Sequence, residues 1–432
     1  MGIEEYVAGL GRFEQDMIRQ RRDFHTFAEP GWREFRTTAK IIETLEKNGI
    51  AVKYGRDIIN RNYLWSYPSP KELDDCISRA ERQGADPEIL KKMDGFTGAC
   101  AVIETGRPGP VAAIRFDIDC NDVTESDAPE HAPAAEHYRS VNDGCMHACG
   151  HDGHASMGIA VCLALNEIRD QLNGTVKIIF QPAEEGVRGA QSIAEGGILD
   201  DVEYFLTSHL GMGWKTGELV ALSRGFLSTR KADAVFTGLS AHAGASPQDG
   251  RNAILAACAA TLGMHTACQD SRGASRINVG TIHGGSGRNV VPDRAVLQLE
   301  TRGETAEIEA DVYRKASQCL EGAAMMFGCT CRTEIRGSAS SSDSDEAMEP
   351  FISAGAARVP EITRYIRESG FSGSEDATYL MARVQSHGGK AAYMCIGSDI
   401  AAPHHNGAFS FDERSLVIGL KLYVSILWEI LH

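Results

Sequence analysis

The sequence lacks several features that would assign it to common protein classes. It has no run of about 18 apolar residues, so we expect no membrane-spanning helix. Its 43 basic residues are outnumbered by 59 acidic ones, which argues against nucleic acid as a partner because phosphate binding needs a basic face. Cysteine is scarce, with 12 in 432 residues, and is scattered singly. Together with a first segment that lacks a basic region followed by an apolar stretch, this predicts a cytoplasmic protein.

Familiar catalytic motifs are missing as well. The chain has no Walker loop, no G-x-S-x-G nucleophile elbow, no H-E-x-x-H pair and no C-x-x-C pair. Residues 284–287 are rich in glycine but do not have the dinucleotide-binding spacing, so we interpret them as a turn.

Alternating strand and helix patterns indicate an α/β protein. Apolar runs at 99–104, 111–116 and 175–180 predict strands, and the apolar stretch 153–169 predicts a helix. This alternation is typical of a mixed, largely parallel sheet covered by helices. Residues 56–97 read as an insertion whose role the sequence does not reveal.

A different pattern fills residues 228–340. Strands are predicted at 232–237, 276–282, 294–300 and 330–336, and helices at 251–268 and 308–327. That order is βαββαβ, the ferredoxin-like arrangement, followed by a Ser- and Asp-rich linker at 338–344. We therefore predict a discontinuous catalytic domain, residues 1–226 and 341–432, interrupted by an inserted domain at 227–340.

The densest group of chemically active side chains lies at 146–154. His147, Cys149, His151, Asp152 and His154 fall within this segment, which its glycines predict to be a loop before the helix. Thiolate and imidazole are preferred ligands of borderline divalent metals, and Asp152 could orient an imidazole. The alternative is a surface loop whose histidines cap the next helix.

Two adjacent carboxylates, Glu184 and Glu185, follow the predicted strand 175–180. Sites in α/β sheets lie beyond the carboxyl ends of strands. Adjacent carboxylates repel unless a cation or proton offsets them, so one could bind metal while the other activates water. The alternative is a solvated helix N-terminus, where acidic residues are also favoured.

Further histidines occur in loops of the same domain. His209 ends a short apolar strand, and His404 and His405 stand next to each other near the end of the chain. Cys149, His151, Glu185, His209 and one of the last two histidines would suffice for a dinuclear metal centre.

Six segments resemble the metallopeptidase family that contains carboxypeptidase G, aminoacylase and the amino-acid-conjugate amidohydrolases. They are MHACGHDGH at 146–154, QPAEEG at 181–186, GLSAHAG at 238–244, RNVVPD at 288–293, GSED at 373–376 and HNGAFSFDE at 405–413. The resemblance implies two divalent ions per subunit, manganese or zinc, bridged by Cys149. His151 and His209 would bind one ion, and Glu185 and His405 the other.

The resemblance also implies catalytic roles. Glu184 would be the general base, and His242 of the inserted domain would stabilise the oxyanion in a partner subunit's active site. Asp117 would orient a metal ligand, although Cys120-Asn121 after it departs from the family pattern. Substrate binding would fall to Asn289 and to one of three arginines. These are Arg288, Arg302 and Arg336.

The implied reaction is hydrolysis of an amide between an acyl or aminobenzoyl group and an amino acid, with glutamate expected. The substrate is thus a small molecule with a carboxylate, with no nucleic acid or membrane partner, and the enzyme a homodimer or a heterodimer with a related subunit. Three alternatives stay open. They are a hydrolase of hippurate-like N-acyl amino acids, a catalytically silent subunit of the same fold, and a redox sensor using Cys145 and Cys149.

Overall fold

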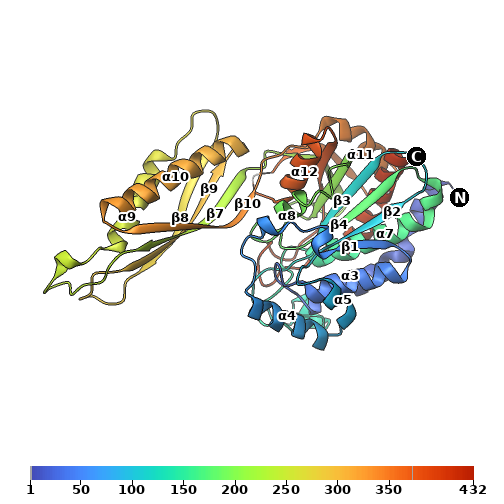
Figure 1. Ribbon diagram of the computed structural model, residues 1–432. Helices are drawn as coiled ribbons and strands as arrows, with labels where there is room; N and C mark the ends of the chain where they lie inside the picture. Colours follow the sequence, from blue (N-terminus) through green and yellow to red (C-terminus); the bar gives the residue numbers. More distant parts are fainter. Residues whose placement is uncertain (1, 372) are drawn as a thin grey trace. The chain divides into compact units, whose positions relative to one another are not determined.

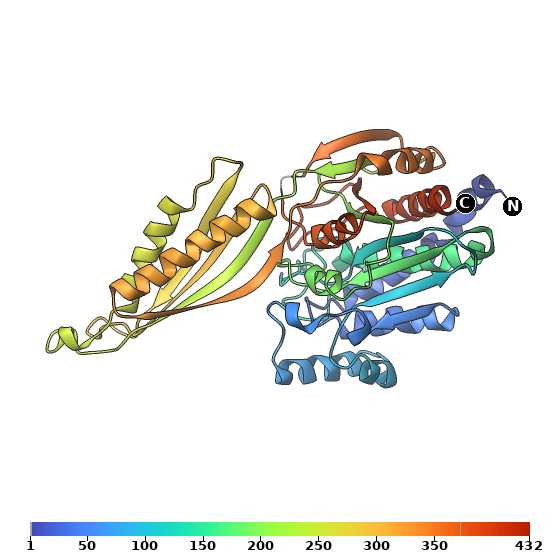
Figure 2. The ribbon, with the colours of Figure 1, turned by 45° about the horizontal axis from the view of Figure 1, so that its top comes forward.

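The computed structural model describes residues 2–371 and 373–432 (Figures 1 and 2). The chain divides into two compact units. Unit 1 comprises Met1–Arg224, Asp343–Phe371 and Asp376–His432, and unit 2 comprises Gly225–Ser342 and Ser372–Glu375. That residues 227–340 serve as a dimerisation or lid domain stays a prediction.

Unit 1 is built on an eight-stranded sheet of order β1-β2-β4-β3-β5-β12-β6-β11. Its strands are β1 (Ala51–Tyr54), β2 (Ala99–Glu104), β3 (Val111–Asp117), β4 (Thr175–Gln181), β5 (Tyr204–Leu210), β6 (Glu218–Arg224), β11 (Arg364–Gly370) and β12 (Lys390–Ile396). The central strands β4, β3, β5 and β12 run parallel, while β1, β2 and the β12–β6 pair are antiparallel. Such central strands are buried on both faces, which explains their continuous apolar runs.

Helices of unit 1 pack around this sheet. They are α1 (Ile3–Gly9), α2 (Glu14–Thr26), α3 (Phe35–Lys47), α4 (Pro70–Arg82), α5 (Pro87–Lys92), α6 (Ala132–Ala135), α7 (His151–Ile168), α8 (Ala190–Ala194), α11 (Glu349–Ala356), α12 (Ala377–Ser386) and α13 (Arg414–Leu431). The long apolar helices α7 and α13 pack on each other and on β3, and α12 packs on β5 and β12. No helix among the described residues is long and apolar enough to cross a membrane.

The start of α7 corrects one prediction. The sequence predicts a loop over residues 146–154, with the helix after it, but α7 already begins at His151. Gly150 immediately before it has φ +92°, a left-handed conformation that glycine adopts without a Cβ penalty, and this lets the chain turn into the helix two residues early. His151 and His154 are therefore held by the first helical turn.

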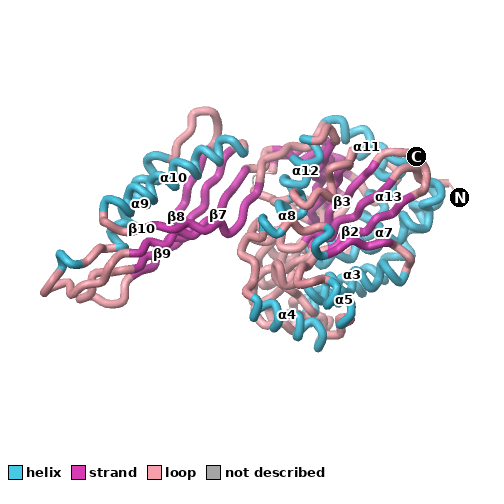
Figure 3. The backbone as a smooth tube through the Cα atoms, in the orientation of Figure 1, coloured by secondary structure: helices cyan, strands magenta, loops and turns pink. Residues whose placement is uncertain are grey.

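Unit 2 contains β7 (Ser228–Thr237), α9 (Ala253–Ala267), β8 (Ser275–Gly284), β9 (Arg294–Gly303), α10 (Ala306–Met326) and β10 (Thr330–Ala339). Its antiparallel sheet has the order β10-β7-β9-β8, and Figure 3 shows both helices on one face of it. The predicted α/β fold class with an inserted βαββαβ domain is confirmed. The last strand runs into the expected linker, because Ser338 and Ala339 still pair with β7.

The insertion at 56–97 packs within unit 1. Its helix α4 begins with a capping box between Ser69 and Glu72. Trp32 donates its indole N–H to the carbonyl of Trp65 at 2.9 Å, and Trp65 in turn donates to the side chain of Gln191 at 2.9 Å. The insertion thus contacts both the turn at Trp32 and helix α8.

Candidate metal centre

Parallel pairing brings the predicted site residues to one edge of the unit 1 sheet. In the β3–β4 ladder Asp117 pairs with Gln181, so both strands end at the same level. Glu184 and Glu185 follow β4 directly, and His209 lies at the end of neighbouring β5. The carboxyl ends of parallel strands meet at one edge, where α/β proteins bind ligands.

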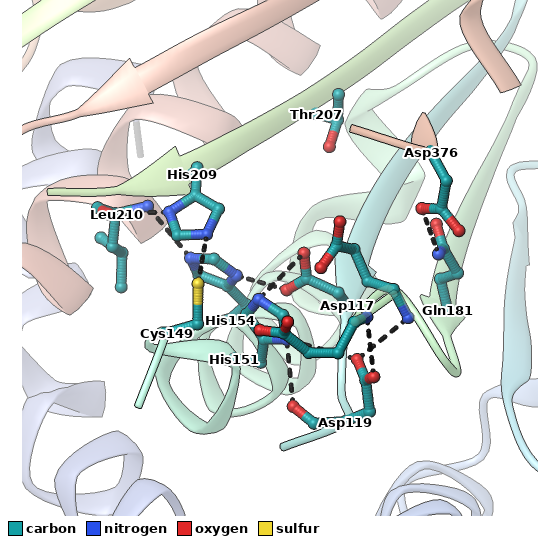
Figure 4. A network of polar contacts seen from close by, with 12 residues as sticks. Asp117, Asp119, Cys149, His151, His154, Gln181, Thr207, His209, Leu210 and Asp376 are labelled. Atoms are coloured by element: carbon teal, nitrogen blue, oxygen red, sulfur yellow. Dashed lines mark hydrogen bonds and ion pairs between the residues drawn. The ribbon is translucent and has the colours of Figure 1, made fainter. Parts of the chain in front are cut away.

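Two groups of potential ligand atoms share Cys149. Cys149, His151 and His209 form one group, and Cys149, Glu185 and His405 the other, with the ligand atoms of each within 4.8 Å of one another. Cys149 Sγ lies 3.3 Å from His209 Nε2, and His405 Nε2 lies 3.4 Å from Glu185 Oε1. Figure 4 draws the contact between Cys149 and His209 as a dashed line. The structure therefore brings together all the residues predicted to bind metal.

Hydrogen bonds from the far side of each imidazole fix which nitrogen faces the cluster. His209 Nδ1 lies 2.8 Å from the carbonyl oxygen of Leu210, and His151 Nδ1 lies 3.0 Å from that of Asp119. A carbonyl only accepts, so both Nδ1 atoms carry a proton, and Nε2 is the nitrogen left to face the cluster. This is the arrangement by which metal-binding histidines are oriented.

The residues of the cluster fit a pair of cations. Among the residues that the structure describes, His151 Nε2 and Glu185 Oε1 are buried without a hydrogen-bond partner, which is costly unless something else binds them. Contacts with Cys149 and Glu185 raise the pKa of His405 to about 10. Without a metal the cluster thus holds a proton that a cation would displace.

Asp119 organises the turn that carries the two glutamates. Its carboxylate accepts the backbone N–H of Glu184 at 3.1 Å and of Glu185 at 2.9 Å. The preceding Ala183 has φ +54°, an uncommon conformation for a residue with a Cβ, and its N–H is held by the carboxylate of Glu34 at 2.7 Å. Buried acids thus fix the position of Glu184 and Glu185.

Comparison with known proteins places the chain in a family. The profile of Peptidase family M20/M25/M40 matches residues 113–429. The chain belongs to this family. It is 44% identical to "Indole-3-acetyl-aspartic acid hydrolase" of Enterobacter agglomerans over 421 residues, covering 97% of this chain and 96% of that protein. It is also 44% identical to one of the subunits of p-aminobenzoyl-glutamate hydrolase of Escherichia coli (strain K12) over 403 residues, 93% of this chain and 92% of that protein.

A solved structure agrees with these relatives. The "Aminobenzoyl-glutamate utilization protein" of Klebsiella pneumoniae has a TM-score of 0.85 and 37% identity, covering 99% of this chain and 98% of that one. The predicted resemblance to the M20 metallopeptidases is confirmed, and within them the chain is similar to the aminobenzoyl-glutamate hydrolases. The predicted class of enzyme, a metal-dependent amidohydrolase, is confirmed with it.

Asp117 contacts two histidines of this M20 site. The Asp117 carboxylate lies 2.5 Å from Nδ1 of His154 and 3.7 Å from Nε2 of His151. The other ring nitrogen of His154, Nε2, accepts the backbone N–H of Leu210 at 3.1 Å. Although burial opposes ionisation, the adjacent Arg115 guanidinium holds the pKa of Asp117 well below its usual range. Asp117 thus contacts the backbone beside His209 through His154 and also lies within ion-pair distance of His151, a predicted ligand.

The choice between the two adjacent histidines follows from their contacts. His405 reaches Glu185, whereas His404 Nε2 lies 3.3 Å from the carbonyl of Leu210, and burial lowers the pKa of His404 to about 4. Asp152 points away from the cluster, toward His25 at 2.8 Å and Arg21 at 2.8 Å.

Residues predicted to bind substrate lie on unit 2. His242 is exposed, and its Nδ1 accepts the N–H groups of Gly244 and Ala245 at 3.1 and 3.0 Å, so the other ring nitrogen carries the proton. Asn289 is adjacent, since its carbonyl accepts the N–H of Ala243 at 3.0 Å.

The three candidate arginines differ in whether their guanidinium groups already form ion pairs within the chain. Arg336 binds Asp233 at 2.8 Å and Glu334 at 2.7 Å. Arg302 binds Glu300 at 2.7 Å. Arg288 is exposed and is the candidate whose guanidinium is not in an ion pair with another described residue.

The sequence analysis placed His154 in the group at 146–154 without giving it a role, and it missed Asp119 and Glu34 as parts of this site. Asp119 stands two residues beyond Asp117, and His154 stands one helical turn after His151, so spacing offered a signal for both. Glu34 offered none, because its contact with Ala183 joins segments that are remote in sequence.

Proposed function

We propose that this protein hydrolyses p-aminobenzoyl-glutamate to p-aminobenzoate and glutamate. The observation that carries the proposal is the pair of ligand groups sharing Cys149, with Glu184 beside them on the same turn as Glu185. The names of two relatives, each matched over more than nine-tenths of this chain, supply the substrate class.

Cys149, His151, His209, Glu185 and His405 would hold two divalent ions, for which manganese and zinc are our candidates. When bound, the ions supply Lewis-acid activation of water and of the scissile carbonyl. Glu184 accepts the proton of the attacking water and later delivers it to the leaving nitrogen, a contribution of roughly 10²- to 10⁴-fold. His242 donates a hydrogen bond from its protonated ring nitrogen to the oxyanion in the partner's active site.

Assembly and location complete the proposal. We expect a dimer, either of this chain or with a related subunit, since the name of one relative describes it as one subunit of a hydrolase. Exposed large apolar side chains support this, because they concentrate on unit 2. Those of unit 2 are Leu239, Leu255, Leu262, Ile282, Met325 and Met326. The free state of the cysteines supports action in the cytoplasm.

The test is release of p-aminobenzoate by purified protein loaded with Mn²⁺ or Zn²⁺, with Glu184→Gln as the matched inactive variant. Metal-dependent release that the variant loses supports the proposal. No release by metal-loaded protein, with or without a related subunit, refutes it.

A second candidate substrate is an indole-3-acetyl conjugate of aspartate. The chain is 44% identical both to the relative named as an indole-3-acetyl-aspartic acid hydrolase and to the relative named as a p-aminobenzoyl-glutamate hydrolase subunit. Sequence identity therefore favours the two substrates equally. Hippurate and N-acetyl amino acids belong in the same assay, and the ranking of kcat/KM decides among the candidates.

A further inference from the structure

Arg188 lies on the turn that carries the two glutamates, immediately before α8, and the predicted chemistry does not use it. Its backbone N–H donates to the carbonyl of Ala183 at 3.1 Å, and its side-chain Nε–H donates to the carbonyl of Glu185 at 2.7 Å. One edge of the guanidinium is thereby anchored to the backbone of a proposed metal ligand. The residue as a whole is half-buried, and no other side chain among the described residues forms a hydrogen bond with its terminal nitrogens.

A glycine makes room for this guanidinium. A Cβ placed on Gly31 would collide with Arg188 Nη2 and would lie only 2.9 Å from the Cα of Ala183. The terminal nitrogens therefore occupy space that a side chain at position 31 would take. Anchored at Nε and confined beside Gly31, the guanidinium is preorganised, which reduces the entropy lost when it binds a ligand.

The charge of Arg188 has no acidic side-chain partner among residues 2–371 and 373–432. Several buried or half-buried arginines of unit 1 do have such partners, as Arg36 does with Asp23 at 2.8 Å and Arg115 with Asp117 at 2.8 Å. Arg107 also lacks an acidic partner among the described residues, and its guanidinium donates instead to Asn173 and to backbone carbonyls. The positive charge is near the proposed metal cluster, because the Nε–H of Arg188 binds the backbone carbonyl of Glu185 at 2.7 Å.

We propose that Arg188 binds the side-chain carboxylate of the acidic amino-acid half of the substrate. The inference rests on the proposed function, in which that half is glutamate or aspartate. Such a half carries two carboxylates. The α-carboxylate is common to every amino-acid conjugate and has Asn289 and Arg288 as its candidate partners, which leaves the second carboxylate without a cation. A planar guanidinium with free N–H groups matches a carboxylate with two parallel hydrogen bonds.

The rival explanation is that Arg188 only stabilises the turn. Its Nε–H bond to Glu185 would then matter equally for every ligand, and its removal would disturb metal binding. The two explanations differ in whether the affinity lost on removing Arg188 depends on the charge of the ligand's side chain.

The experiment measures binding of L-glutamate and L-glutamine to the metal-loaded full-length protein by calorimetry, in wild type, Arg188→Gln and Arg188→Lys. The two amino acids have similar shapes and differ in the side-chain charge. Arg82→Gln, at an exposed position on α4, is the matched control for loss of a positive charge. Metal content and melting temperature are recorded for each variant.

We expect Arg188→Gln to weaken glutamate binding by about 10- to 100-fold, the range for a hydrogen bond to a charged group, and glutamine binding by less than about threefold. The affinity of Arg188→Lys for glutamate should lie between those of wild type and Arg188→Gln. This variant replaces Arg188→Gln in the comparison if the latter does not fold. Equal losses for both amino acids, or a wild type that does not prefer glutamate, overturn the inference. Turnover is not needed for this result, so a failure of the proposed reaction is seen separately, as absence of p-aminobenzoate release.

Discussion

At the scale of single residues, Glu184 and Glu185 are adjacent but have different surroundings. Both residues are half-buried, but Glu185 is grouped with Cys149 and His405, with its Oε1 3.4 Å from His405 Nε2, whereas Glu184 belongs to neither of the two groups that contain Cys149. Glu184→Gln should lower turnover by roughly 10²- to 10⁴-fold with the metal content unchanged, because only a proton acceptor is lost. Glu185→Gln should lose metal as well as activity. Elemental analysis beside the turnover assay checks both, and equal metal loss in the two variants would contradict the assignment.

Glu34 gives a prediction about pH. Burial, followed by the charge of Asp119, raises its pKa to about 8. Between the ordinary pKa of 4.5 and this raised value, the Glu34 carboxyl is protonated in the folded state and ionised in the unfolded state. The contribution of Glu34 to the stability of the fold is therefore complete below about pH 4.5. That contribution is lost as the pH rises from about 4.5 to 8, by at most about 1.4 kcal/mol per pH unit. Glutamine does not ionise, so the stability of Glu34→Gln relative to wild type should be higher at pH 8 than at pH 5.

Melting temperatures of the metal-free protein across this pH range provide the measurement. Glu46→Gln, at an exposed position on the neighbouring helix α3, is the control and should run parallel to wild type. A Glu34→Gln curve parallel to wild type would show that this carboxyl does not titrate in the range.

At the scale of elements, Arg21 joins three segments of unit 1. On α2 it is fully buried, with Nε 2.8 Å from Asp152 on α7 and Nη1 3.2 Å from Glu413 just before α13. Arg21→Met removes the guanidinium partner of the buried Asp152 and should cost about 3–5 kcal/mol, whereas Glu413 keeps Arg22 at 2.8 Å. Urea unfolding measures this. Arg19→Met on the same helix removes an exposed ion pair with Asp16 and should change the stability by less than about 1 kcal/mol.

The elements were largely predictable because their signals are local. Apolar runs bounded by turns located β2, β3 and β4 to within one residue, and the βαββαβ order of unit 2 followed from the same patterns. The start of α7 was not predicted, because it depends on the conformation of Gly150. The insertion at 56–97 stayed uninterpreted for a further reason. Its contacts, such as that of Trp65 with Gln191, join segments far apart in the sequence.

The candidate site was predictable in composition but not in its supporting contacts. Motifs pointed to the residues around Cys149 and Glu185, since metal ligands must be of a few chemical types. Of the acids that hold the glutamate turn, Asp119 was signalled only by its spacing from Asp117, and Glu34 carried no signature. Arg188 also looks like an ordinary surface arginine until its position beside Gly31 is known.

At the scale of the whole molecule, the apolar side chains on unit 2 predict an interface between two protomers. Leu255 and Leu262 are exposed on α9, and Ile282 is exposed on the edge strand β8. A glutamate at position 262 would place a charge in that interface, so Leu262→Glu should convert a dimer to a monomer in sedimentation velocity. Val141→Glu, at an exposed apolar position of unit 1, should leave the dimer intact. A wild-type protein that is active as a monomer would contradict the predicted assembly.

The most direct test of the central claim is the release of glutamate from p-aminobenzoyl-glutamate by the purified protein, before and after removal of metal by a chelator. We predict turnover that depends on Mn²⁺ or Zn²⁺, stops on chelation, returns when metal is restored, and is lost in Glu184→Gln. Turnover that persists without metal or without Glu184, or no turnover on any amino-acid conjugate with metal bound and a related subunit supplied, would contradict it.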